Sequence, residues 1–328
     1  MMQKLVRLAK LPGYLRRNAI VGMNQRNGRY IFSYNPRRLY PLVDDKILTK
    51  KLAQDADIAV PEMYGVIDIE HDIKRLPDIV QRYEDFVIKP AQGSRGNGIL
   101  VIQGKSRGGY LLANGAMMSD ADVEHHISNI INGLYSLGGV TDRALIEARV
   151  RFDPVFHDVS YRGVPDVRTI VFRGLPVAAM LRLPTRAAGG KANLHQGAVG
   201  TGIDLSTGLT TRSVWNGQYV DEHPDTHTGI AGRRIPHWED VLVLAARCGE
   251  LADLGFLGVD IVLDSVHGPM MLELNARPGL AIQLANGFGL RQRLQQVEAL
   301  DDIPTDAIGR ARLARDMFTQ GESLERSL

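Results

Sequence analysis

The chain has 328 residues, of which 44% are hydrophobic and 23% charged, the balance of a globular protein rather than a fibrous or disordered one. Its 39 Lys and Arg against 37 Asp and Glu leave a formal net charge of +2, so composition offers no broad electrostatic basis for binding nucleic acid. The single cysteine excludes an internal disulfide and a CxxC metal site. Because no stretch reaches the roughly 18 apolar residues of a membrane span and residues 1–17 lack a secretory-signal pattern, we expect a cytoplasmic protein without a membrane span.

The N-terminal part of the chain is basic and shows little βαβ pattern. Leucines at helical spacing in residues 1–17 predict a short amphipathic helix, which docks either on the protein's own core or on an anionic surface. Asn24, Arg26 and Asn27 belong to an Arg- and Asn-rich cluster that either lines a site for an anionic substrate or forms a solvated basic face. Residues 44–57 predict a helix with acidic residues in its first turn.

A glycine-rich segment separates two predicted strands, residues 86–90 and 99–102. Together they make a hairpin with an enlarged, flexible tip, and Lys89 lies at the end of the first strand, pointing either outward or at an anion. Backbone N–H groups of residues 93–98 would be able to approach phosphates closely. The tip lacks the Lys-Ser/Thr ending of a GxxxxGK[ST] loop, so an ordinary flexible hairpin is an equal alternative.

Alternating and helical apolar patterns predict the remaining elements. The expected strands are residues 145–147, 167–172, 177–183, 258–264 and 269–275, and the expected helices are residues 120–137, 238–254 and 290–300. Residues 205–236 are predicted to form a loop, which is long for a compact domain. We therefore expect this loop to be either a functional lid or an insertion. From residue 301 onward the chain is polar enough to be a loosely held tail.

The last pair of strands carries the most specific pattern. If its hairpin loop has four residues, Asp264 pairs with Pro269 and Asp260 lies opposite Glu273. Asn275 is two residues beyond Glu273 and therefore shares its face. Two carboxylates side by side on an apolar hairpin would repel unless a cation joins them. We therefore expect Mg²⁺ shared with phosphate oxygens, the alternative being three unrelated polar residues on a solvated face.

Two arginines and a polar loop complete the pattern. Arg168 and Arg182 lie inside apolar strands and need anions, either a phosphate or a carboxylate such as Asp166 in a structural ion pair. The glycine-flanked residues 189–197 have the composition of a mobile loop that closes over a reacting phosphate. His195 in this loop is either a base or simply a polar residue.

Taken in chain order, these segments resemble the ATP-grasp superfamily, and most closely its RimK-type branch, the alpha-L-glutamate ligase-like proteins. The matching segments are Asp45-Lys46 and residues 87–90 with the glycine loop, 146–148, 166–168, 193–195, 258–261 and 272–279. Residues 22–27 and 40–46 are similar to the alpha-L-glutamate ligase-like subgroup in particular.

The resemblance implies a role for each matching residue. The nucleotide would be held at its phosphates by Lys46 and Lys89 under the loop residues Gly93, Ser94, Gly96 and Gly98, and at adenine and ribose by Glu147, Ala148 and Val150. The cation, Mg²⁺ or alternatively Mn²⁺, would be bound by Asp260, Glu273 and Asn275. The transferred phosphate would be faced by Arg168, Arg182, Lys191 and Asn193.

The implied fold is α+β, with two ATP-grasp subdomains that clasp ATP but without the full-length α/β domain that usually precedes them. We expect an N-terminal segment over residues 1–43, an N-terminal subdomain with the glycine loop over 44–145, a C-terminal subdomain with the metal site over 146–285, and a C-terminal helix and tail over 286–328.

The implied activity is ATP-dependent ligation of a carboxylic acid to an amine through an acyl phosphate. Glutamate or another amino acid would be one substrate, and an amino acid, a peptide or a protein would be the acceptor. A kinase on the same fold and a catalytically silent nucleotide-binding regulatory protein are the alternatives, while a homo-oligomer is left open. Retention of the three metal-binding residues and both arginines disfavours the silent protein, because nucleotide binding alone tolerates their loss.

Overall fold

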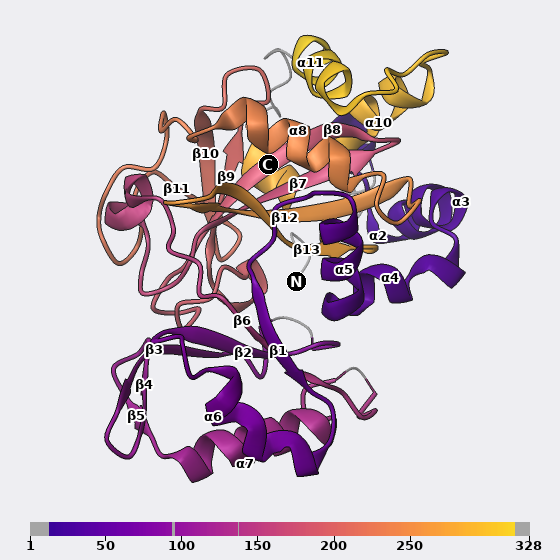
Figure 1. The fold of residues 1–328 in the computed structure, drawn as a ribbon. Helices are drawn as coiled ribbons and strands as arrows, with labels where there is room; N and C mark the ends of the chain where they lie inside the picture. The colour runs from indigo at the N-terminus through magenta and orange to yellow at the C-terminus, as the bar shows by residue number, and fades with distance from the viewer. Residues whose placement is uncertain (1–12, 94–95, 137, 319–328) are drawn as a thin grey trace, which may run out of the picture.

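The structure is a computed structural model that describes residues 13–93, 96–136 and 138–318. The chain forms a small and a large lobe, each built on an antiparallel sheet (Figure 1). The small sheet has six strands in the order β1-β6-β2-β3-β4-β5, and the large one has seven in the order β11-β10-β9-β8-β7-β12-β13. The chain crosses from the small sheet to the large one after Glu147, two residues beyond the expected subdomain boundary.

The small lobe places its helices on one face of its sheet. Its strands are β1 (Met63–Ile67), β2 (Phe86–Pro90), β3 (Leu100–Ser106), β4 (Gly109–Leu112), β5 (Met117–Met118) and β6 (Ala144–Glu147). The helices are η3 (Glu70–Arg75), α6 (Leu76–Ile79) and α7 (Asp120–Ile131). Phe86 and Ile88 of β2 join the core beneath these helices, so strand alternation turns Lys89 to the opposite face.

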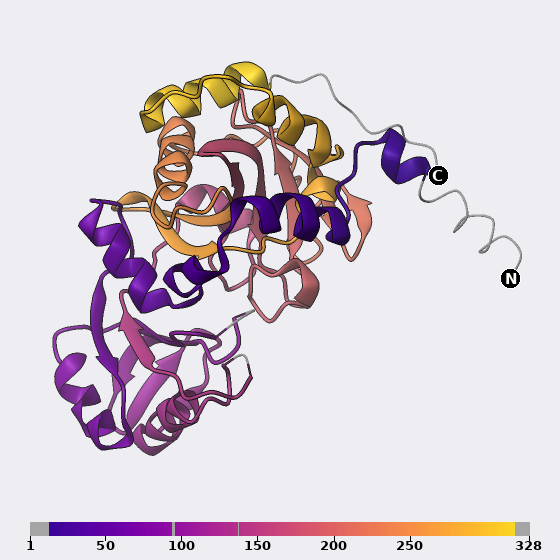
Figure 2. The ribbon, with the colours of Figure 1, turned by 90° about the vertical axis from the view of Figure 1, so that its right-hand side faces the viewer.

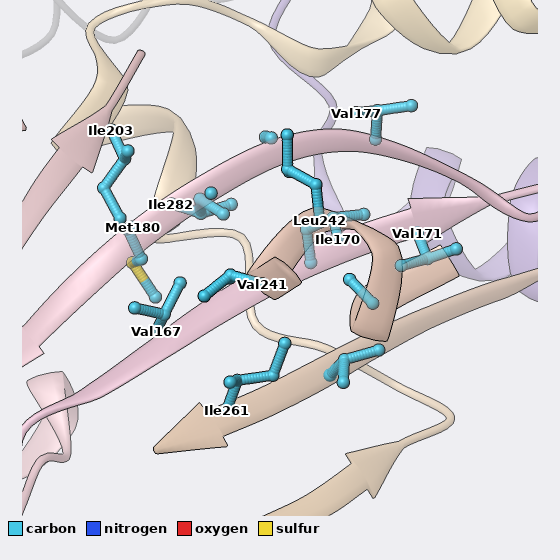
Figure 3. Packing of buried hydrophobic residues seen from close by; sticks show 14 of the residues in the cluster. Val167, Ile170, Val171, Val177, Met180, Ile203, Val241, Leu242, Ile261 and Ile282 are labelled. Atoms are coloured by element: carbon cyan, nitrogen blue, oxygen red, sulfur yellow. The ribbon is translucent and has the colours of Figure 1, made fainter. Parts of the chain in front are cut away.

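The large lobe holds the main core. Its strands are β7 (Asp166–Phe172), β8 (Leu175–Leu183), β9 (Val199–Ile203), β10 (Thr210–Trp215), β11 (Gln218–Val220), β12 (Phe256–Asp264) and β13 (Gly268–Asn275). Helices that pack on the sheet include α8 (Trp238–Cys248), α9 (Ile282–Asn286) and α10 (Leu290–Glu298). Figure 3 shows Val241 and Leu242 of α8 among the apolar side chains of β7, β8 and β12.

Two predicted segments differ from the structure. Residues 205–236 are not the expected loop, because within them β10 pairs with β9 and β11 pairs with β10, which extends the large sheet. The expected loose tail is wrong from residue 307 onward, where α11 (Ala307–Met317) packs on α8 and β8 and buries Ala311 and Ala314. Short alternating or amphipathic segments between turns gain their structure from tertiary packing, which composition does not report.

The predicted helices are present but shorter. Residues 44–57 are divided into α4 (Pro41–Asp44) and α5 (Lys46–Asp55), because Asp45 takes an extended conformation and caps α5 by accepting hydrogen bonds from the backbone N–H groups of Ile47 and Leu48. The helices α7 and α8 end at Ile131 and Cys248, where turns follow.

The N-terminal segment lies along the large lobe (Figure 2). It contains α2 (Met23–Gln25), the π-helix η1 (Arg26–Ile31), α3 (Phe32–Tyr34) and η2 (Arg37–Leu39). Tyr30 is buried in the large core, and the Asn35 amide bonds the backbone of Phe256 and Ala276. Most of the predicted helix over residues 1–17 lies outside the described residues. Among the described helices, none is long and apolar enough to cross a membrane.

Candidate active site

A cleft with a volume of about 220 Å³ is lined by residues from both lobes. Lys46 and Lys50 of α5 line it together with Gln92 and Gly93 of the glycine loop, and Glu273 and Asn275 of β13 contribute too. The remaining lining residues are Val43, Asp44, Thr49, Met271, Leu272 and Leu274. The structure therefore brings residues predicted to contact phosphate and residues predicted to bind a cation into one space.

On the small-lobe side, a buried carboxylate holds two lysines. Glu147 Oε1 lies 2.5 Å from Lys89 Nζ, and Glu147 Oε2 lies 2.7 Å from Lys50 Nζ. All three side chains are at most 5% exposed. Although burial opposes ionisation, Lys89 and Lys50 hold the pKa of Glu147 below its usual range. The structure thus places Glu147 as the partner of two ammonium groups, where the resemblance implied contacts to adenine or ribose.

Lys50 is a site residue that sequence analysis missed. It follows Lys46 by four residues, and that spacing puts both ammonium groups on one face of α5. Lys46 Nζ donates to the Gly93 carbonyl over 2.7 Å, and Lys50 Nζ donates to the Pro61 carbonyl. The i, i+4 spacing of the two lysines was the available signal.

Burial lowers the pKa of Lys50 to about 8 from its ordinary 10.5, although Glu147 opposes the shift. Between these two values the unfolded chain holds a proton that the folded protein has lost, so the free energy of unfolding rises with pH. We expect wild type to gain about 1 kcal/mol per pH unit over the Lys50→Met variant in this window. Urea unfolding of both proteins at about pH 8, 9 and 10 measures the difference, and parallel pH dependences would contradict the assignment.

The glycine loop is anchored at both ends. Asp142 accepts hydrogen bonds from the backbone N–H of Gln92 over 3.0 and 3.1 Å. At the other end, the Gly98 carbonyl lies 2.9 Å from His126 Nε2. Gly96 and Gly98 have φ of +73° and +74°, which L side chains rarely adopt. Ser94, the remaining polar residue expected in the loop, falls outside the described residues.

On the large-lobe side, charged residues form a row across four strands. Arg168 stands opposite Asp260, and Asp260 opposite Glu273. Arg168 Nε lies 2.6 Å from Asp260 Oδ1, and Arg182 Nη2 lies 2.7 Å from both Asp166 Oδ2 and Asp260 Oδ2. Asp260 is 1% exposed; burial alone would raise its pKa, yet Arg168 and Arg182 hold it well below the usual range.

The predicted pairing of Asp260 with Glu273 is present, but the predicted hairpin loop is one residue too long. Asp264 pairs with Gly268 rather than Pro269, which leaves three residues in the loop. A bulge after Asp260 restores the register, because Asp260 faces Glu273 while Ile261 faces Met271. The extra residue in β13 therefore sits beside the charged row.

The loop over residues 189–197 reaches the same region from the large lobe. A side chain at Gly96 would meet the Lys191 stem at 3.4 Å, so this loop touches the glycine loop. The Asn193 side chain accepts a hydrogen bond from the backbone N–H of His195 and caps the short helix η5 (Leu194–Gln196). Lys191 therefore lies near the expected phosphate-binding loop, whereas Asn193 shapes its own loop.

Residues 25–299 match the model of the sugar-transfer associated ATP-grasp family. The chain belongs to this family. The expected ATP-grasp fold is thereby confirmed, with its two α+β lobes and two antiparallel sheets. The family description mentions neither the RimK type nor glutamate. No curated protein sequence matches the chain.

Several solved structures have a similar chain path to this ATP-grasp protein. The ATP-grasp ligase PsnB, complexed with a minimal precursor, is 14% identical with a TM-score of 0.44; 80% of this chain and 61% of that chain are covered. The D-cycloserine synthetase DcsG is 13% identical with a TM-score of 0.44 and coverages of 86% and 73%. D-alanine–D-alanine ligase from Bacillus anthracis is 11% identical with a TM-score of 0.45 and coverages of 85% and 70%. The chain thus spans about three fifths of the length of PsnB.

The donor set at the charged row fits a hard cation. Glu273 is within hydrogen-bonding reach of Asp260, and Asn275 Nδ2 lies 3.3 Å from Glu273 Oε1. These three side chains gather oxygen donors, which Mg²⁺ prefers, at the edge of the cleft. Within the described ranges no group of three or more His, Cys, Asp or Glu forms a metal cluster, so an ion bound here would need further ligands from phosphate or water.

The backbone beyond Glu147 is already engaged. Ala148 N donates to the Glu62 carbonyl over 2.8 Å, and Val150 packs against Val262 and Met270. The expected contacts of Ala148 and Val150 with adenine therefore remain a prediction. They would have to be made by atoms other than the Ala148 N–H and the packed Val150 side chain.

Proposed function

We propose that this ATP-grasp protein is an ATP-dependent carboxylate–amine ligase. The observation that supports this best is the cleft itself, because Lys46 and Lys50 of α5 line it together with Glu273 and Asn275 of β13. Phosphoryl transfer requires positioning and neutralisation of negative charge more than covalent help from the protein. Cations and oxygen donors gathered in one cleft meet that requirement.

In the proposed reaction, an oxygen of the substrate carboxylate attacks the γ-phosphorus of ATP and ADP leaves. The amine then attacks the carbonyl carbon of the acyl phosphate, releases phosphate and loses a proton to form the amide. Lys46, Lys50 and Lys89 would hold the nucleotide phosphates, and Arg168 would face the transferred group. Arg182, fixed by Asp166 and Asp260, would orient that row. Loop residues Gly96 and Lys191, which touch, would limit water that hydrolyses the intermediate.

Mg²⁺, or Mn²⁺ in its place, would be held by Asp260, Glu273 and Asn275 and would supply neutralisation of phosphate charge. Asp260 shares its oxygens with two arginines. Its role at the metal would therefore include holding those arginines in place, while the side chain of Glu273, 35% exposed, faces the cleft more openly.

We infer an amino acid, with glutamate first, as one substrate. This inference rests on the resemblance of residues 22–27 and 40–46 to alpha-L-glutamate ligase-like proteins. The family description points instead to an association with sugar transfer. Measuring ADP release with amino acids offered singly and in pairs tests the inference, and activity requiring a different acid would remove glutamate.

Isotope transfer tests the ligase mechanism directly. With a carboxylic acid labelled with ¹⁸O, we expect one labelled oxygen to appear in the released phosphate for each amide formed, because the phosphate leaves with the oxygen that attacked ATP. Mass spectrometry of the phosphate measures this transfer. Label that stays in the acid while ADP accumulates would indicate a kinase or a simple ATPase.

A further inference from the structure

A second set of cations lies beside the cleft, outside the residues assigned to nucleotide and metal. Arg26 opens the π-helix η1 of the N-terminal segment, and Arg277 follows Asn275 by two residues. Arg26 Nη1 donates to the Pro278 carbonyl over 2.9 Å. Pro278 in turn packs on Gly258, where a side chain would meet Pro278 at 2.8 Å and Asn275 at 3.6 Å. Arg26 is thus held near Asn275, one of the proposed metal-binding residues, through its contact with Pro278.

Arg26 lies beside the segment that carries Arg277, because its Nη1 binds the carbonyl of the adjoining Pro278, and both guanidinium groups are poorly neutralised. Burial, with a smaller contribution from the positive charge of Arg277, lowers the pKa of Arg26, which nevertheless stays protonated near neutral pH. In the described part of the chain Arg26 has no carboxylate within ion-pair distance. Among the described residues, Arg277 pairs with one carboxylate, Asp44 at 3.0 Å, and both of these side chains are about half exposed. Exposed pairs of this kind contribute little and exchange easily for another anion. The Arg277 guanidinium also lies 5.2 Å from the centre of the Tyr40 ring.

The surroundings place this pair at the mouth of the cleft. Asp44, the partner of Arg277, lines the cleft. On the other side, His195 Nε2 lies 4.0 Å from the position of a side chain at Gly279, so the loop over residues 189–197 adjoins the segment that carries Arg277. The π-helix is a rare conformation that frequently occurs at functional sites, and here its first residue is the partly buried Arg26.

We propose that Arg26 and Arg277 bind an anionic group, a carboxylate or a phosphate, of the substrate that is ligated in the cleft. This assignment rests on the proposed function, since it supplies the substrate with a second, non-reacting anion. Guanidinium groups suit both anions because they donate paired hydrogen bonds. It also gives the N-terminal segment a part in substrate recognition.

Titration of the full-length protein saturated with Mg²⁺ and the non-hydrolysable nucleotide AMPPNP tests the proposal, with L-glutamate as one probe and inorganic phosphate as the other. Saturation keeps phosphate out of the nucleotide site. We expect Arg26→Gln and Arg277→Gln each to weaken anion binding about tenfold or more, because a hydrogen bond to a charged group contributes more than one between neutral groups. The affinity for AMPPNP should change less than about twofold. Tighter binding of L-glutamate would identify the anion as a carboxylate, and tighter binding of inorganic phosphate would identify it as a phosphate.

Arg29→Gln is the matched control, because Arg29 lies on the same π-helix but pairs with Glu298 at 2.6 Å. It should leave anion binding unchanged. Arg26→Lys keeps the positive charge and should recover part of the affinity, which separates recognition from damage to the fold. Equal anion binding in all variants, or no binding of either probe to wild type that binds AMPPNP, would overturn the proposal.

Failure of the proposed function can be distinguished from failure of the proposed anion site. If AMPPNP does not bind, the anion titrations are repeated without nucleotide. A loss of binding confined to the Arg26 and Arg277 variants would still support the anion site, and its absence would overturn it.

Discussion

Replacing Asp260 by Ala should lower the free energy of unfolding by about 3–5 kcal/mol, because it removes the close carboxylate partner of Arg168 and one of the two partners of Arg182. Asp166 would still hold Arg182, but Arg168 would retain only Glu273, at 3.9 Å. Urea unfolding followed by circular dichroism measures the change. Turnover should disappear as well, since Arg168 loses the partner that positions it.

A surface aspartate provides the comparison for this variant. Asp158 pairs with Arg233 but is 52% exposed, so Asp158→Ala should change stability by at most about 1 kcal/mol. Asp260→Asn keeps the shape of the side chain and removes only its charge. Similar stability of Asp260→Ala and Asp158→Ala would show that the charged row does not hold the arginines as described.

Replacing Glu273 by Gln should have the opposite profile, with activity lost and the fold kept. Its side chain is 35% exposed at the cleft, so stability should move little. If Glu273 binds the cation, turnover should fall about a hundredfold or more, because a bound cation stabilises the transition state by several kcal/mol. The rate of ADP release over a range of Mg²⁺ concentrations measures the effect.

Excess Mg²⁺ should recover part of the activity of Glu273→Gln, since two ligands remain. Glu239→Gln is the matched control, because Glu239 is 76% exposed and pairs with Arg315 on α11. Unchanged turnover in Glu273→Gln, at any Mg²⁺ concentration, would remove the metal assignment.

Local sequence patterns predicted the parts of the site that depend on the alternation of apolar and polar residues in strands and on strand ends marked by Gly or Pro. The strand that ends at Pro90 and the pairing of Asp260 with Glu273 are both present. The hairpin loop was predicted with four residues and has three, and a bulge in the register compensates. Bulges depend on side-chain packing along both strands, and no short motif encodes them.

Other features depend on contacts between distant segments. Glu147 is held by Lys50 from α5 and by Lys89 from β2, and Arg182 is held by Asp166 and Asp260 from two strands. A single sequence shows each charge but not its partner. For this reason the ionic alternative considered for Asp166 describes Arg182 well, whereas the two lysines that pair with Glu147 were not foreseen and its contact with adenine and ribose stays a prediction.

The shared carboxylate of Glu147 has a consequence for the proposed binding of ATP phosphates by Lys50 and Lys89. Lysine side chains lose considerable rotamer freedom when they are immobilised. Since Glu147 already restrains Lys50 and Lys89, most of that entropy is given up when the chain folds and little is left to lose when a polyphosphate arrives. A site with restrained lysines selects ligands whose negative charges match the fixed positions of the two ammonium groups. It disfavours anions that would require these groups to move.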